Sequence, residues 1–117
     1  MNEFDVPIFQ KSYDLYKQMH EYQKLIPKHD RYTVYSRAEN CLLIVISNLF
    51  KASAIDKESK LTLLEVTSAE LNLLRVFIRL LKDIKALDNT KYLSLQSEID
   101  EIGRMLGGWI KSVKPSR

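Results

Sequence analysis

Few residues in this 117-residue chain are of the kinds that build metal centres, disulfides or tight turns. The sequence has one cysteine, two histidines, three glycines and three prolines. A single cysteine cannot form an intrachain disulfide, and it leaves too few soft ligands for a zinc cluster. The scarcity of glycine and proline favours long helices joined by few turns. Disulfide-stapled and zinc-cluster folds are therefore excluded.

The chain also lacks an apolar run long enough to cross a membrane. Its longest run, Cys41–Ile46, is far shorter than the roughly 20 residues that a spanning helix needs. The first five residues include Glu3 and Asp5, whereas a signal peptide begins with basic residues. Together with the single cysteine, these features predict a cytoplasmic protein with no membrane partner.

The overall charge decides little about partners. Eighteen basic residues are nearly balanced by 15 acidic ones, which gives a net charge of +3. Contact with nucleic acid would have to come from the local distribution of the basic groups. The length and a hydrophobic content of 45% predict a single domain, residues 1–117, with a core of moderate size.

Apolar residues recur at helical spacing in four segments, and no segment alternates as a strand would. The predicted helices run from Pro7 to Ile26, from Asp30 to Ala54, from the Asp56–Lys60 segment to Leu87, and from Tyr92 to Val113. The start of the third helix is left open, because its charged first segment suits either a turn or a helical turn. Four long helices with short connections predict an all-α, antiparallel up-down four-helix bundle.

The third predicted helix has more apolar surface than one core can cover. Apolar residues between Leu71 and Leu87 span about 220° of its circumference, whereas a core-facing helix needs about 100° or somewhat more. The excess includes Leu73, Val76 and Leu80. We expect these side chains to pack against another copy of the chain.

Three glycines, Gly103, Gly107 and Gly108, interrupt the last helix. Each should weaken the helix by about 1 kcal/mol relative to alanine. Gly103 and Gly107 lie four residues apart on one flank, beside the apolar stripe that contains Trp109. We expect close packing, either within the chain or against another protomer, to compensate for this cost.

Basic residues follow one face of the third helix, since Arg75, Arg79 and Lys82 have the i, i+4, i+7 spacing. Helix geometry extends the candidate surface to a set of six residues: Arg75, Arg79, Lys82, Lys85, Arg104 and Lys111. Arginine suits bidentate contacts with phosphate. Ordinary solvated charges, paired with Asp83 or Glu101, explain the same spacing, so both interpretations stay open.

Groups that could carry enzyme chemistry are scarce. His20 and His29 belong to no HExxH or Glu-x-x-His motif. Cys41 falls on an apolar stripe and suits a small buried position better than a nucleophile. The acidic segment Glu98–Glu101 is typical of a solvated face. We therefore predict a protein that is not an enzyme and has no cofactor and no metal.

Three segments resemble the accessory variability determinant (Avd) proteins of diversity-generating retroelements. These segments are Ile26–Lys28, Leu74–Leu81 and Glu101–Ile110, and the last, with its glycines and tryptophan, is the most specific. The resemblance extends over most of the chain. A sister group, encoded in intervening sequences of bacterial 23S ribosomal RNA genes, shares the general plan. It provides the alternative, a structural oligomer of undefined role.

The Avd resemblance implies a non-enzymatic four-helix protein that assembles into a homopentameric barrel with a central pore. It also implies three partners, the retroelement reverse transcriptase, the template-repeat RNA and the cDNA, which act together in mutagenic retrohoming. Arg75 and Arg79 match two family arginines on a basic surface needed for the reverse transcriptase and for nucleic acid. The resemblance thus favours the phosphate-binding interpretation of the basic strip.

Overall fold

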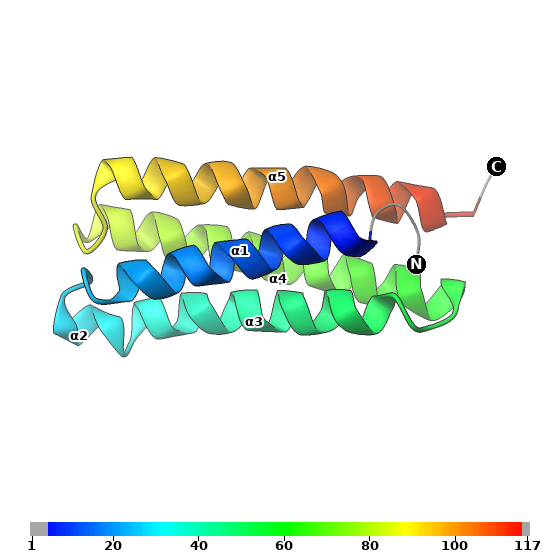
Figure 1. The fold of residues 1–117 in the computed structure, drawn as a ribbon, viewed down its shortest axis with the longest axis horizontal. Helices are drawn as coiled ribbons and strands as arrows, with labels where there is room; N and C mark the ends of the chain where they lie inside the picture. The colour runs from blue at the N-terminus through cyan, green and yellow to red at the C-terminus, as the bar shows by residue number, and fades with distance from the viewer. Residues whose placement is uncertain (1–4, 116–117) are drawn as a thin grey trace.

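A computed structural model describes residues 5–115 of the chain as a rod in which neighbouring long helices run antiparallel (Figure 1). Its elements are α1 (Asp5–Gln23), α2 (Lys28–Arg31), α3 (Val34–Ala52), α4 (Lys57–Asp83) and α5 (Asn89–Val113). The rod measures 48 × 22 × 19 Å, and its described residues form no strand. The predicted all-α four-helix bundle is confirmed. Glu3, used above in the signal-peptide reasoning, lies outside the described residues.

One apolar core runs along the axis of the rod. Helix α1 packs against α3 and α5, and α4 packs against the same two helices from the other side. The stripes predicted from helical spacing supply this core, and its largest fully buried side chains are Trp109 and Tyr35. No helix in the described part of the chain is long and apolar enough to span a bilayer.

The connection between α1 and α3 differs from the prediction of one helix from Asp30 to Ala54. The chain forms the short helix α2 and then breaks at Thr33, whose hydroxyl donates to the His29 carbonyl oxygen at 2.8 Å. Such a bond competes with continued helix formation, particularly at a β-branched residue. Asp30 therefore lies inside α2 and is not an N-cap.

The C-terminal end of α1 comes three residues before the predicted Ile26. Arg31 occupies the space beyond it, since its Nη2 atom donates to the carbonyl oxygens of Lys24 and Ile26 at 3.2 and 3.0 Å. A cationic side chain at this position satisfies carbonyl groups that have no partner within the helix. The α1–α2 turn is thus held by a side chain whose role the local pattern did not reveal.

Side-chain caps fix the starts of α4 and α5. Asp56 accepts from the Ser59 amide, and Asp88 accepts from the Lys91 amide, both at 2.9 Å. These bonds settle the open start of the third predicted helix at Lys57, and they start the last helix at Asn89, three residues before the predicted Tyr92.

The end of α4 at Asp83 corrects the prediction that this helix extends to Leu87. Lys85 adopts a left-handed backbone conformation with φ 64°. The amides of Ala86 and Leu87 both donate to the Leu81 carbonyl oxygen. This pattern ends the helix much as a C-terminal glycine would. Lys85 therefore lies in the turn and does not continue a helix face.

A polar contact within the core joins α1 to α3 near the α2 end of the bundle. The Tyr35 hydroxyl donates to the Met19 carbonyl oxygen, and Gln23 Nε2 donates to the buried Glu39 carboxylate at 3.3 Å. Burial raises the pKa of Glu39 above its ordinary 4.5, although the Gln23 hydrogen bond and the charge of His20 lower it. The folded chain therefore binds this proton more tightly than the unfolded chain.

Replacing Glu39 with glutamine is expected to stabilise the protein near neutral pH. A raised carboxyl pKa means that stability is lost as the pH rises from the ordinary pKa through the raised one. The amide variant has no such loss, and its oxygen can still accept from Gln23. Chemical unfolding at about pH 4 and about pH 7 should show the variant gaining on the wild type as the pH rises. An unchanged difference between the two proteins would show that Glu39 carries no such penalty.

Candidate nucleic-acid interface

A groove between α4 and α5 brings together three of the predicted basic residues. The hollow has a volume of 440 Å³ and is lined by Arg75, Val76, Arg79, Tyr92, Gln96 and Asp100. Lys82 lies beside it, against the Tyr92 ring. The Lys82 Nζ atom is 4.7 Å from the centre of the Tyr92 ring, a cation–π arrangement. The groove thus combines three cations with one aromatic ring.

Arg75 is the most constrained of these cations. Its Nε atom lies 3.1 Å from an Asp100 oxygen of α5, and its guanidinium also donates to Asn72. A Cβ atom at position 103 would lie only 2.7 Å from Arg75 Nη2. Gly103 therefore makes room for a side chain of α4, which is a close α4–α5 contact of the kind expected for this glycine.

Arg79 is held more loosely. Its Nε atom lies 3.4 Å from Asp83, one helical turn along, and both side chains are exposed. Exposed ion pairs contribute roughly 0 to 1 kcal/mol. Exchanging Asp83 for a phosphate oxygen would therefore cost little, and the ion pair does not prevent Arg79 from binding an anion.

The other predicted basic residues do not join this groove. Arg104 pairs with Glu101 and lines a different hollow between α1 and α5, which also contains Glu98 and Asp100. Lys111 is exposed further along α5, and Lys85 lies in the turn after α4. The acidic neighbours of Arg104 show that the basic surface does not spread across α5 at this point.

Three residues of the groove were missed in the sequence reasoning, namely Tyr92, Gln96 and Asp100. They lie four residues apart on one face of α5, and Gln96 Nε2 donates to the Arg75 carbonyl oxygen at 3.3 Å. Their i, i+4, i+8 spacing was visible in the sequence. The spacing does not predict how α5 is aligned against α4, and this alignment places Asp100 opposite Arg75.

Apolar side chains form a stripe on the side of α4 that faces away from the core. This outer stripe consists of Val66, Leu73, Val76, Leu80 and Ile84, all of them exposed. Buried residues occupy the opposite side of the same helix, including Leu71, Leu74 and Ile78. The excess apolar surface expected on this helix is therefore present and uncovered in the single chain.

The glycine–tryptophan segment divides between the inside and the outside of the protomer. Trp109 is fully buried in the core, so its packing role is within the chain and it is not available to a neighbouring protomer. Gly107 has the opposite setting, because a Cβ atom built on it would meet nothing within 4 Å. Gly108 is half-buried. For Gly107 and Gly108, a role in assembly stays a prediction.

Replacing Gly107 with alanine tests whether this glycine packs against another protomer or only weakens its own helix. Within one chain the new methyl group fits, and the exposed helix should gain about 0.5 to 1 kcal/mol. If another protomer packs closely against Gly107, the same methyl group should weaken the assembly. Thermal unfolding and light scattering on the same samples measure the two effects. A stabilised variant with unchanged assembly would remove Gly107 from the interface.

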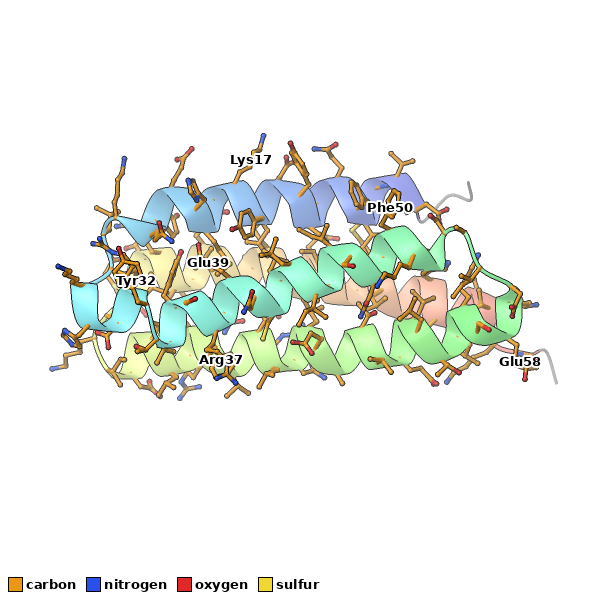
Figure 2. All side chains as sticks on the ribbon, turned by 90° about the horizontal axis from the view of Figure 1, so that it is seen from below. Lys17, Tyr32, Arg37, Glu39, Phe50 and Glu58 are labelled. Carbon is orange, nitrogen blue, oxygen red and sulfur yellow. The ribbon has the colours of Figure 1, made fainter. Side chains whose placement is uncertain are left out.

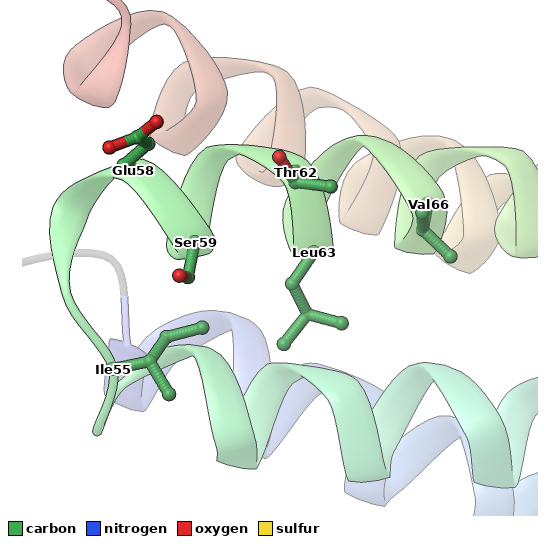
Figure 3. Close-up of a pocket in the computed structure, with 6 residues that line it drawn as sticks. All are labelled: Ile55, Glu58, Ser59, Thr62, Leu63 and Val66. Carbon is green, nitrogen blue, oxygen red and sulfur yellow. The ribbon is translucent and has the colours of Figure 1, made fainter.

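The described part of the chain has other hollows, some of which contain few ionisable groups. Figure 3 shows one between the α3–α4 turn and α4, with Ile55 and Leu63 pointing into it and Ser59 between them. Its only ionisable lining residue is Glu58, and the Ser59 hydroxyl bonds to Asp56 at 3.2 Å. Burial and Glu70 raise the pKa of the Cys41 thiol to about 12, which suits a small buried residue. Across residues 5–115, no three metal-ligating side chains gather to hold an ion.

Comparison with known proteins supports the fold and identifies the family. A solved structure of a protein of unknown function, from the S23 ribosomal protein family of Bacteroides thetaiotaomicron, has a TM-score of 0.83 with this chain. The alignment covers 92% of this chain and 98% of that one at 18% identity, so it establishes shared fold alone. No curated protein sequence matches. The model of the bAvd-like family matches residues 7–113, almost the whole chain, and the protein therefore belongs to the bAvd-like family.

Proposed function

We propose that this protein is a non-enzymatic accessory subunit of a diversity-generating retroelement. In this role it binds the reverse transcriptase, the template-repeat RNA and the cDNA through a basic surface, and so supports mutagenic retrohoming. Family membership and the groove formed by Arg75, Arg79 and Lys82 together support the proposal. Among the features of individual residues, the groove is the main support for the proposed function.

The chemistry of the groove suits a polyanion. Arg79 is exposed and weakly paired, Lys82 is half-buried over Tyr92, and Arg75 presents a guanidinium fixed by Asp100. Phosphate accepts from guanidinium in bidentate geometry, and each contact releases counterions from the nucleic acid. We infer that the three cations of the groove contact the phosphate backbone of the nucleic acid and do not recognise its base sequence.

Assembly is the second part of the proposal. The outer stripe of α4 supports contact between protomers, because the exposed side chains of Leu73, Val76 and Leu80 would leave water. We propose a homopentameric barrel, the arrangement implied by the Avd resemblance. In that arrangement the stripe serves the ring, and the groove borders it, because Val76 belongs to the stripe and also lines the groove.

Replacing both Arg75 and Arg79 with alanine should weaken binding to a template-repeat RNA while leaving the fold intact. Both side chains lie at the surface, and with two fewer cations the slope of log affinity against log salt should fall by about 1.4. Fluorescence anisotropy at several salt concentrations gives affinity and slope together. Lys17 and Lys51, exposed and remote from the groove, provide the matched double-alanine control. If the control loses the same amount of RNA affinity, the loss reflects the total charge of the protein and not the groove.

The alternative is a structural oligomer without a nucleic-acid role, like that considered for the 23S intervening-sequence group. The outer stripe favours assembly under either function, and the shared fold with an S23-family protein is compatible with both. RNA binding decides between them. Assembly without salt-sensitive RNA binding would favour the structural role.

A further inference from the structure

The basic residues of the chain are concentrated at one end of the rod. Segments 21–37 and 79–91 lie at the same end, where α2 and the α4–α5 turn are drawn in Figure 1. We call these two segments the basic end. Their basic residues are Lys24, Lys28, Arg31, Arg37, Arg79, Lys82, Lys85 and Lys91, against the acidic residues Glu21, Asp30, Asp83 and Asp88.

This distribution polarises the rod. The basic end holds eight of the 18 basic residues and four of the 15 acidic ones, a net charge of +4, so the rest of the chain has a net charge of −1. A local excess of this kind attracts polyanions even when the bulk charge is small. The sequence order hid the excess, because the two segments are far apart along the chain.

An exposed aromatic ring stands among these charges. Tyr32, between α2 and α3, is 68% exposed. The central guanidinium carbon of Arg31 lies 6.0 Å from the centre of its ring. Figure 2 shows Tyr32 at the α2 end, with Arg37 on the side of α3 that faces α4. The ring contributes nothing to the apolar core, so packing does not explain its position.

A hollow adjoins this ring and connects α3 with α4. Its volume is 500 Å³, and its lining includes Tyr32, Arg37 and the half-buried Phe77 of α4. Aromatic rings and a guanidinium both offer flat surfaces on which a planar base can stack. A phosphate next to that base would lie near the cations of the basic end.

We propose that the basic end binds single-stranded nucleic acid and that Tyr32 is a platform on which one base stacks. In a duplex the faces of the bases are covered by their neighbours, so an aromatic platform selects an unpaired strand. The proposal rests on the proposed function, because it assigns nucleic acid to a second surface of the rod, on the α3 side of α4. Arg79 and Lys82 belong to both surfaces, whereas Glu98, Asp100 and Glu101 repel a phosphate chain in the direction of Arg104.

Replacing Tyr32 with alanine tests the platform by affinity. Loss of one stacked base should weaken binding to a short single-stranded RNA about fivefold or more, with duplex RNA unaffected. Tyr13 offers a matched control, since it is 50% exposed and Lys17 Nζ lies 5.4 Å from its ring centre, yet it is outside the basic end. Tyr13→Ala should bind both RNAs like the wild type.

A tryptophan probe tests stacking directly. The single native tryptophan, Trp109, is fully buried and gives a constant background. Fluorescence of Tyr32→Trp should be quenched by single-stranded RNA and not by the duplex, because stacking on a base quenches an indole. The same probe at Tyr13→Trp should not respond.

Four outcomes would overturn the proposal. They are unchanged single-strand affinity in Tyr32→Ala, equal losses for single-strand and duplex RNA, equal quenching at both probe positions, and loss of reverse-transcriptase binding alone, which would assign Tyr32 to a protein contact. If Arg75→Ala/Arg79→Ala loses RNA affinity while Tyr32→Ala does not, the platform is wrong and the proposed function stands. If the wild type binds no single-stranded RNA, the proposed nucleic-acid role fails as well.

Discussion

Replacing Trp109 with alanine is expected to lower the free energy of unfolding by about 3 to 5 kcal/mol. Its indole is the largest fully buried side chain, so its removal leaves a large cavity in the core. A domain of ordinary stability has roughly 5 to 15 kcal/mol in total, so the variant should lie near the limit of folding. Urea unfolding followed by circular dichroism measures the loss.

Two further variants make the Trp109 experiment specific. Trp109→Phe keeps most of the apolar volume and removes the indole Nε1 donor, which is buried without a partner, so its loss should be much smaller. Phe50→Ala removes an aromatic side chain that is exposed on α3 and touches Phe9. A Trp109→Ala loss no larger than that of Phe50→Ala would contradict the assignment of Trp109 to the core.

Replacing Val76 with aspartate is expected to break the assembly while leaving each protomer folded. Val76 is 58% exposed in the single chain, so a carboxylate there is solvated in an isolated protomer. In an interface the same carboxylate would lose its water, at a cost of several kcal/mol that the neighbouring Arg75 and Arg79 would offset only in part. Light scattering should then report a shift from an oligomer to the 13.7 kDa protomer.

Leu93 provides a matched control for the Val76 experiment. It is 56% exposed on α5, in the polar hollow that also contains Arg104. Leu93→Asp should leave the assembly unchanged, because Leu93 is not part of the outer stripe. A wild type that is already monomeric at micromolar concentration, or a Val76→Asp protein that stays assembled, would remove the stripe from the interface.

Most of the fold follows from periodicity. Apolar residues at helical spacing predicted which side of each long helix is buried, and the caps at Asp56 and Asp88 are local signals in the sequence. Helix ends were less predictable. Lys85 takes a left-handed conformation that usually belongs to glycine, and the break at Thr33 depends on one hydroxyl bonding back to His29. Neither has a strong local signature.

The candidate site divides in the same way between local and tertiary information. Arg75, Arg79 and Lys82 share a helix face at any packing, so their spacing sufficed to group them. The pairing of Arg75 with Asp100 depends on how α4 and α5 are aligned. The basic end depends on α2 and the turn after α4 lying at the same end of the rod. The spacing of residues along one helix cannot predict contacts between segments that are distant in the sequence.

The glycine–tryptophan segment gained a sharper interpretation from the structure. Gly103 gives space to the Arg75 side chain, Trp109 fills the core, and Gly107 faces open space. The segment therefore links three parts of the account, namely the basic groove, the stability of the protomer and a surface available for assembly. At Gly103 the close contact lies within the chain, against Arg75, and at Gly107 we propose that it lies against a neighbouring protomer.

Copurification with the cognate reverse transcriptase tests the central claim most directly. The reverse transcriptase is tagged and coexpressed with the wild type, with Arg75→Ala/Arg79→Ala, or with the Lys17→Ala/Lys51→Ala control, and light scattering establishes that each assembly is intact. We predict that the wild type and the control copurify with the tagged enzyme and that the double arginine variant does not. Equal recovery of all three proteins would contradict the role of the α4–α5 groove in binding the reverse transcriptase.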